Sequence, residues 1–499
     1  MTWYELPQAV QAHRARPATV SPVRGGALVR ERDPWTTTFA LSLSLVALGH
    51  TLQISNGFFQ PRALLWLTAA FLVAVLGVAL PPIPQLERLG AKAVLFVLGA
   101  GLAWQFVQLL TKPPGDALHL TGSRPYLPFF VALAVAAALA GSGLFTSPRL
   151  ERARVPLLLL THFLLGVWLI NVSTNPIIDV NVFQRDSIHA LLHGINPYAI
   201  TFPDIHGHSP FYGPGLSVNG RVLFGYPYPP LSLFLAVLGY VVGGDYRYAQ
   251  LTAMTLAGAC MAYARPGRLG ALAATVFLFT PRIFYVLEFA WTDPYVVLLL
   301  CATVFCACRA PKLLPLMLGL FLVVKQYLVL VVPLTWLLVP APFRWRDLWR
   351  LWWPAAVVGA VVTLPLMLWN IPAFMRDVVT LQLVQPFRLD ALSYLAGWVR
   401  AGHRQPPIWV PVAAVIPITA LVLLRDPRTP AGFAAAIALV YFAFFAFNKQ
   451  AFCNYYFFVV GALGCAIATR WPTIGDDADR STASGGGGWS KSSVVETIR

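Results

Sequence analysis

Charged side chains are scarce in this sequence of 499 residues. Asp, Glu, Lys and Arg make up 11% of the chain, whereas a typical soluble domain carries about a quarter. Hydrophobic residues make up 58%, and the mean hydropathy is +0.66. A chain with so few charges cannot cover a large water-facing surface with groups that water solvates. These values exclude a soluble enzyme and predict a protein embedded in a membrane.

Cysteines are few, and nucleotide-binding motifs are absent. The six cysteines lie in or beside apolar runs, and none shows the spacing of a zinc or redox motif. There is no Walker A sequence and no Rossmann glycine fingerprint, so we expect no nucleotide cofactor. Residues 1–34 lack the apolar core of a cleavable signal peptide, so the first span is expected to act as the targeting signal.

The formal net charge of +16 is distributed in clusters along the chain. Arginines gather in short segments between apolar runs, as at 149–154 and 344–350. Cytoplasmic loops of membrane proteins show this pattern, because they carry an excess of Lys and Arg. We therefore expect contact with membrane lipids and no binding of nucleic acid.

Fourteen apolar segments are candidates for crossing a bilayer. A complete span needs about 20 residues, and fewer where a helix is broken inside the protein. The even number places both termini on the cytoplasmic side and leaves two long outer loops, at 175–246 and 370–407. The segments are 35–54, 62–80, 91–110, 125–146, 154–174, 247–264, 268–287, 293–308, 312–324, 327–340, 352–369, 408–424, 430–447 and 453–469.

Charge decides two details of this topology. Counting the apolar segment 231–242 as a span would move several arginines outside, so we expect an interfacial helix along the outer surface. For the same reason, 312–340 should form two short helices broken at Lys325 and Gln326, which then face outward. The expected organisation is a cytoplasmic segment 1–34, an accessory four-helix bundle 35–150, a second transmembrane domain 151–470 and a disordered cytoplasmic tail 471–499.

Polar residues follow the fifth span directly. Asp179 stands at the membrane surface, and Asp186, His189 and His193 recur at spacings of three and four, which predicts a short surface helix. An Asp also suits the N-cap of such a helix, so Asp179 has a structural as well as a catalytic interpretation. The two histidines have zinc-ligand spacing, but no third ligand stands nearby, so no metal site is predicted. His206 is interpreted as an ordinary loop residue.

Further polar residues are expected on the same face. Separated cations suit a phosphate or pyrophosphate, whereas carboxylates and aromatic rings suit sugar hydroxyls and ring faces. Ionisable groups at membrane depth indicate function, because their burial is costly. Lys325 could also extend from a span to the interface, and Tyr455 could belong to an interfacial aromatic belt. The residues are Glu288, Asp293, Lys325, Gln326, Arg388, Asp390, Lys449, Asn454 and Tyr455.

The order of these motifs resembles the GT-C superfamily of membrane glycosyltransferases. An Asp opens the first long outer loop, and a surface helix and the segment Gly-Ile-Asn-Pro-Tyr (194–198) follow it. Tyr-Pro-Pro (228–230) precedes the interfacial helix, Lys-Gln stands at a broken helix, and the last outer turn is rich in aromatics. The resemblance is strongest to bacterial polyprenyl-phosphate-mannose-dependent mannosyltransferases and covers 154–470. The four preceding spans depart from that pattern.

This resemblance implies an all-α GT-C fold with outer juxtamembrane helices, and an inverting transfer of a hexose, typically mannose. Asp179 matches the general base, and Lys325, Arg388 and Lys449 would bind the donor phosphate. A lipid-linked sugar is the implied donor and a glycolipid or glycan the acceptor; no cofactor is implied, and a need for divalent metal is left open. Residues expected to shape the sugar and acceptor sites are Asp186, His189, His193, Asn196, Tyr198, Tyr228, Glu288, Asp293, Gln326, Asp390, Asn454 and Tyr455.

Two other functions fit an apolar chain with polar groups on one face. A transporter or flippase for lipid-linked sugars would show repeats and charges near the bilayer midplane, which the sequence does not display. A polymerase or ligase using a pyrophosphate carrier would have an Arg-rich outer loop, and 370–407 fits that description. The expected location is the bacterial inner membrane, with the active site on the extracytoplasmic face.

Overall fold

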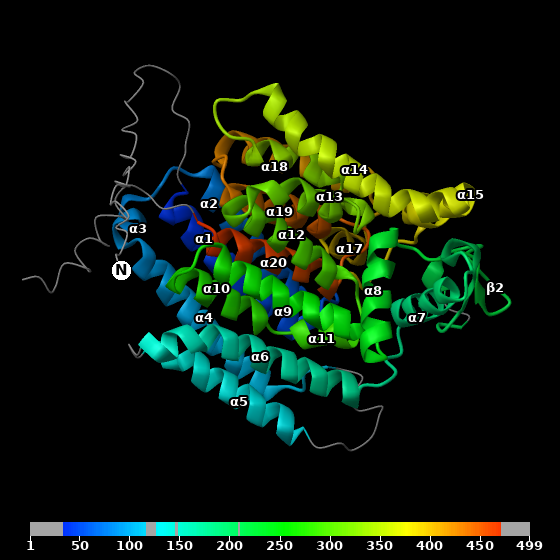
Figure 1. Cartoon of the computed structure of the whole chain (residues 1–499), viewed down its shortest axis with the longest axis horizontal. Coiled ribbons are helices and arrows are strands. Elements are labelled where there is room, and N and C mark those ends of the chain that lie inside the picture. Colours follow the sequence, from blue (N-terminus) through cyan, green and yellow to red (C-terminus); the bar gives the residue numbers. More distant parts are fainter. Residues whose placement is uncertain (1–32, 116–125, 145–147, 208–209, 471–499) are drawn as a thin grey trace, which may run out of the picture.

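A computed structural model of the chain describes residues 33–115, 126–144, 148–207 and 210–470. It is 74% helix and 2% strand, and most helices run side by side along one direction (Figure 1). Among the described residues, five helices are long and apolar enough to cross a membrane, which agrees with an all-α membrane protein. The count of fourteen spans stays a prediction. The five are α1 (Trp35–Ser55), α2 (Pro61–Ala79), α4 (Ala91–Thr111), α6 (Pro148–Val172) and α14 (Trp345–Trp369).

Shorter helices occupy most of the other predicted spans. One predicted span, 268–287, is two helices, because the chain turns at Thr280 and Pro281 and Arg282 adopts a left-handed conformation. These helices are α5 (Leu127–Gly141), α9 (Arg247–Ala264), α10 (Arg268–Leu278), α11 (Ile283–Glu288), α12 (Asp293–Arg309), α13 (Leu314–Leu322), α18 (Val410–Arg425), α19 (Pro430–Ala446) and α20 (Cys453–Ala468).

The predicted break in 312–340 is present. Helix α13 ends at Leu322, Lys325 has an extended backbone, and the 3₁₀ helix η6 (Gln326–Leu338) begins after it. The segment predicted as an interfacial helix is α8 (Pro230–Gly243), which starts at a proline and ends before Gly244 in the left-handed conformation. In Figure 1, α8 runs across the direction of the long helices.

The first helices do not stand apart from the rest. Helix α1 packs against α2, α4 and α20, and α4 packs against α10. Helices α19 and α20 are buried along most of their lengths, so they form the centre of one continuous apolar core. The predicted boundary between residues 150 and 151 falls inside α6, and the division into an accessory bundle and a second transmembrane domain stays a prediction. The predicted segment 1–34 (except its last two residues) and the tail 471–499 lie outside the described residues.

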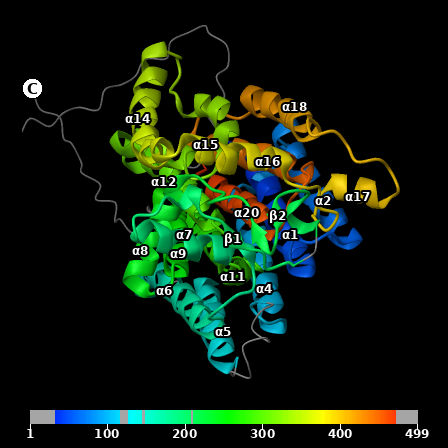
Figure 2. The same ribbon diagram turned by 90° about the vertical axis from the view of Figure 1, so that its right-hand side faces the viewer.

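One end of the bundle, here called the loop-rich end, carries the short elements. A three-stranded antiparallel sheet in the order β1–β3–β2 covers α7, and Figure 2 looks onto these elements. The loop-rich end comprises α7 (Asp179–Leu192), η3 (Pro197–Ala199), β1 (Phe202–Pro203), η4 (Pro210–Tyr212), β2 (Ser217–Val218), β3 (Arg221–Val222), α15 (Ile371–Phe374), η7 (Met375–Thr380), α16 (Leu381–Val384) and α17 (Tyr394–Arg400).

The opposite end of the bundle gathers arginines. Arg265 donates to the carbonyl of Arg470 (3.0 Å), and Arg425 and Arg470 line a small cavity of about 30 Å³ with Asp33. Cations also stand at the loop-rich end, among them Arg185, Arg388 and Arg404, so the assignment of the two ends to the two sides of the membrane stays a prediction. Short elements at or near this end are η2 (Ser142–Leu144), α3 (Pro84–Leu89) and η5 (Pro311–Leu313).

The turn between α1 and α2 supplies a test of how firmly the first helices are joined to the core. Gly57 has φ +78°, and a Cβ there would overlap the backbone of Cys453 at the start of α20. We expect Gly57→Ala to lower the thermal midpoint in detergent by several degrees, because left-handed strain alone costs about 1–2 kcal/mol. Gly99→Ala is the control, since a Cβ at Gly99 meets open space on α4. Equal midpoints for both variants would contradict this packing.

Candidate functional site

Asp179 is the first residue of α7. Its Oδ1 accepts the N–H of the next residue, Val180, at 2.8 Å. The N-cap position belongs to Ile178, whose side chain makes no capping bond, and Asp179 is itself the first helical residue, bonded to the N–H of its direct neighbour and not to an N–H two or three positions on, as an N-cap side chain would be. The structural interpretation as an N-cap is therefore not supported. Near the positive end of the helix dipole, the ionised carboxylate is favoured.

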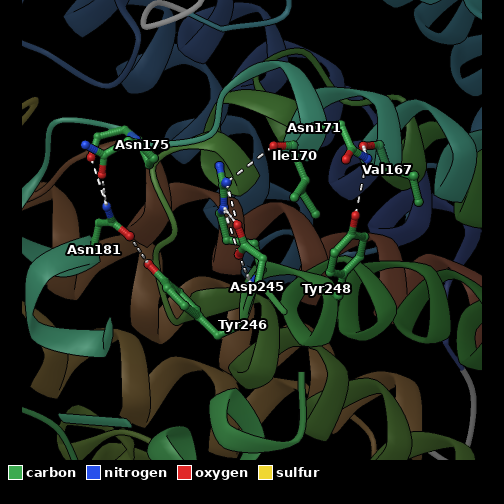
Figure 3. Close-up of polar contacts among 10 residues, drawn as sticks. Val167, Ile170, Asn171, Asn175, Asn181, Asp245, Tyr246 and Tyr248 are labelled. Atoms are coloured by element: carbon green, nitrogen blue, oxygen red, sulfur yellow. Dashed lines mark hydrogen bonds and ion pairs between the residues drawn. The ribbon is translucent and has the colours of Figure 1, made fainter. Parts of the chain in front are cut away.

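Hydrogen bonds fix the segment before α7 against the start of α9 (Figure 3). The Asn181 side chain accepts from the hydroxyl of Tyr246 at 2.8 Å and donates to the carbonyl of Pro176 at 3.1 Å. Arg247, which is almost fully buried, pairs with Asp245 at 2.6 Å and reaches the carbonyl of Ile170. These bonds connect the end of α6, the start of α7 and the start of α9, so they set the position of Asp179.

The sheet brings a histidine toward Asp179 from far along the chain. His206 stacks on Phe211, with ring centroids 3.6 Å apart, and the Arg388 guanidinium lies 4.1 Å from the same ring. Burial raises the pKa of Asp179, while the charges of His206 and Arg388 oppose that rise. Burial likewise lowers the pKa of His206, and the Asp179 carboxylate works against it. Asp179, His206 and Arg388 therefore form one electrostatic group.

A second group is built around Asp293, which is completely buried at the start of α12. Its Oδ2 accepts from Lys325 Nζ and from Asn454 Nδ2, each at 2.7 Å. Its Oδ1 accepts from the Tyr327 hydroxyl at 2.8 Å. Three donors around a buried carboxylate compensate for its lost hydration, which an isolated charge could not tolerate. The group joins α12, the break before η6 and the start of α20.

Tyr228 connects the two groups. The Lys325 ammonium lies 5.5–5.7 Å from the ring centres of Tyr228, Tyr327 and Tyr455, within the range of cation–π attraction. Burial raises the pKa of Tyr228, and the carboxylates of both Asp179 and Asp293 add to the rise. Asp179 and Asp293 therefore both act on Tyr228, which belongs to the aromatic wall of Tyr228, Tyr327 and Tyr455 around Lys325. We call this combined region the polar recess: Asp179, His206, Tyr228, Asp293, Lys325, Tyr327, Arg388, Asn454 and Tyr455.

The segment containing Tyr228 is held by the residues of the Asn-Pro-Tyr motif. The Asn196 side chain accepts the N–H of Tyr198, and the Tyr198 hydroxyl donates to the carbonyl of Tyr228 at 2.8 Å. Gln326 donates to the carbonyl of Pro227 at 2.9 Å. Asn196, Tyr198 and Gln326 thus position the aromatic wall through backbone contacts, a role that their separation in the sequence did not suggest.

The three cations predicted to bind phosphate already have partners. Lys325 pairs with Asp293, and Arg388 binds both oxygens of Asp390 at 2.9 and 2.7 Å. Lys449 donates to two backbone carbonyls, those of residues 383 and 385, at 3.0 and 2.7 Å. Burial lowers the pKa of Lys449. Arg388 and Lys449 are neighbours, because the backbone N–H of Arg388 donates to the carbonyl of Lys449 at 3.1 Å, and Lys325 and Arg388 are neutralised by carboxylates.

Other predicted site residues make their contacts elsewhere. Asp186 forms an exposed ion pair with Arg185, and His189 lies against Tyr240 on the outside of α7. His193 bonds the carbonyl of its neighbour one turn back. Glu288 is buried against Gly115, which lies in the segment after α4. A Cβ at Gly115 would overlap the Glu288 carboxylate. Within the described residues, no group of three His, Cys, Asp or Glu side chains is arranged to hold a metal.

The ion pair between Lys325 and Asp293 gives a direct test of the recess. Lys325→Met and Asp293→Asn should each destabilise the protein strongly, by about 3–5 kcal/mol, because each leaves a buried charge without its partner. The double variant should lose less than the sum of the two single losses. Unfolding in mixed micelles of the four proteins measures this coupling. Strictly additive losses would show that the two side chains do not interact.

Comparisons with protein-family models, with curated proteins and with solved structures found no match for this chain. The likeness to GT-C glycosyltransferases therefore depends on the motifs alone.

Proposed function

We propose that this chain is a membrane glycosyltransferase that transfers a hexose from a polyprenyl-phosphate carrier to an acceptor hydroxyl. The observation that carries the proposal is the polar recess, where a half-buried Asp179 lies beside His206 and Arg388 and shares an aromatic wall with Asp293. A carboxylate, a guanidinium and several tyrosines match what a sugar phosphate and a hydroxyl acceptor require.

In this mechanism Asp179 accepts the proton of the attacking hydroxyl. The acceptor oxygen forms a bond to the anomeric carbon, and the bond from that carbon to the phosphate oxygen breaks. The phosphate leaves with the electron pair, so the configuration at the anomeric carbon inverts. Burial raises the pKa of Asp179, which makes its carboxylate a stronger base than that of an exposed Asp.

The donor phosphate is assigned to the cations around Asp179. Arg388 is the cation that acts on Asp179 electrostatically, and its planar guanidinium can exchange Asp390 for phosphate oxygens. Lys449 is held by carbonyls alone, so its charge is not cancelled by a carboxylate among the described residues. Lys325 and Asn454 both bond the buried Asp293, and this group would support the ring of Tyr228 beside the sugar.

The proposal places the loop-rich end on the extracytoplasmic side of a bacterial inner membrane and the arginine-rich end in the cytoplasm. The cluster of Arg265, Arg425 and Arg470 supports this orientation under the positive-inside rule. The donor would then enter from the bilayer, and the acceptor from either the bilayer or the aqueous side.

Asp179→Asn tests the base. The change keeps the shape and the acceptor oxygen for Val180 while removing basicity, so transfer from a labelled polyprenyl-phosphate hexose should fall by at least a hundredfold. Asp347→Asn is the control, because that Asp forms an exposed ion pair on α14. Membranes with each protein would be assayed with a crude lipid acceptor. Transfer that survives in Asp179→Asn would move the base to Asp186; no transfer by the unchanged protein would favour transport or a pyrophosphate carrier.

Arg388→Gln tests the electrostatic group through the pH profile. The Arg388 charge favours ionised Asp179 and so holds its pKa down. Without that charge the pKa of Asp179 rises, and activity on the acid side should be lost at a higher pH than in the unchanged protein. The measurement is kcat/KM against pH, with Arg221→Gln as the control, since Arg221 bonds only Thr201. If the acid limb of the profile does not shift, the Arg388 charge does not act on the base.

A further inference from the structure

A groove of about 460 Å³ opens at the loop-rich end, apart from the polar recess. The ends of three helices form it: the last turns of α1, the first turns of α2 and the residue after α4. Its lining residues are His50, Ile54, Gln60, Arg62, Leu65, Trp66 and Lys112.

The groove is cationic. Arg62 and Lys112 are both exposed, and no carboxylate is among the described residues that line it. Lys112 donates to the carbonyl of Gln53 at 3.2 Å, and Arg62 makes no hydrogen bond or ion pair within the part of the chain that the structure describes. Among the described residues neither of these two cations is paired with a carboxylate, whereas Lys325 and Arg388 in the recess both are.

Aromatic and apolar side chains border the cationic part. His50 meets Trp66 edge-on with ring centroids 5.0 Å apart, lies 6.1 Å from Trp104, and bonds Gln108 at 2.6 Å. Trp66 and Trp104 are about half exposed, and Leu65 is 71% exposed. Both α2 and α4 are long apolar helices, so these exposed surfaces are suited to acyl chains and not to water.

We propose that this groove binds the phosphate headgroup of an anionic membrane phospholipid. Arg62 and Lys112 would bind the phosphate oxygens, Arg62 through paired hydrogen bonds and Lys112 as a point charge. The acyl chains would lie along the exposed apolar faces of α2 and α4. A soluble phosphate would leave those faces uncovered, whereas a phospholipid satisfies both the charges and the apolar surface.

The bound lipid would lie next to the segment that joins the first helices to the recess. Gln60 lines the groove, and the neighbouring Phe59 donates its N–H to the carbonyl of Asp390 at 2.8 Å. Phe58 pairs with Ala391 as an isolated β-bridge. The turn between α1 and α2 thus lines the groove and also contacts Asp390, the partner of Arg388. Lipid binding itself does not depend on the proposed transfer reaction.

Native mass spectrometry of the full chain tests the proposal. The purified protein would be titrated with phosphatidylglycerol and, separately, with phosphatidylcholine, and bound copies would be counted. The variant Arg62→Gln/Lys112→Gln removes both cations. The matched control Arg185→Gln/Arg404→Gln removes two exposed cations elsewhere at the loop-rich end, so the net charge is the same.

The expected result is one tightly held phosphatidylglycerol in the unchanged protein and in the control. Its affinity should fall by roughly thirtyfold in Arg62→Gln/Lys112→Gln, and phosphatidylcholine should bind weakly to all three. Equal retention of phosphatidylglycerol by both double variants would overturn the proposal. So would retention of a polyprenyl phosphate, but not phosphatidylglycerol, that depends on Arg62 and Lys112, since the groove would then be a carrier-lipid site.

Discussion

The buried pair of Asp293 and Lys325 is the interaction on which the loop-rich end depends. A lysine in the middle of an apolar run is tolerated only with a partner, and Asp293 supplies one at 2.7 Å. The extended backbone at Lys325, which separates α13 from η6, allows the side chain to reach that carboxylate. Asn454 and Tyr327 complete the coordination, so α12, η6 and α20 meet at one carboxylate. Tyr228, and the segments that are hydrogen-bonded to it, are arranged around the Lys325 ammonium.

The sequence predicted those features that depend on local pattern. The break at Lys325 follows from charge and hydropathy, and α8 follows from an apolar run between prolines and glycine. The interaction partners of the site residues were not predictable, because they depend on which segments meet in space. His206 stands 27 positions (206 − 179) beyond Asp179 in a loop without periodic signal, and only the small sheet brings it close. For His189, helical spacing indicated a helix but not which side would face the recess.

The first helices illustrate the same limit. The first four predicted spans, between residues 35 and 146, hold no ionisable residue at their centres, a pattern that predicts an accessory bundle. Hydropathy reports that a helix is apolar, but not which neighbour it contacts. In the structure α1 lies against α20, and the turn after α1 touches both Ala391 and Cys453. Those contacts make the turn a wall of the region that holds Arg388, so these helices belong to the architecture of the recess.

Whether a cation is paired with a carboxylate decides how its site attracts an anion. Arg388 and Lys325 are already neutralised, so the recess projects little field beyond its own walls. An anion entering it exchanges partners at contact distance, and its association rate should depend little on ionic strength. Arg62 and Lys112 face the groove without carboxylates among the described residues, so salt should weaken attraction there. The two proposed sites would thus attract anions differently, the recess at contact distance and the groove over a longer range.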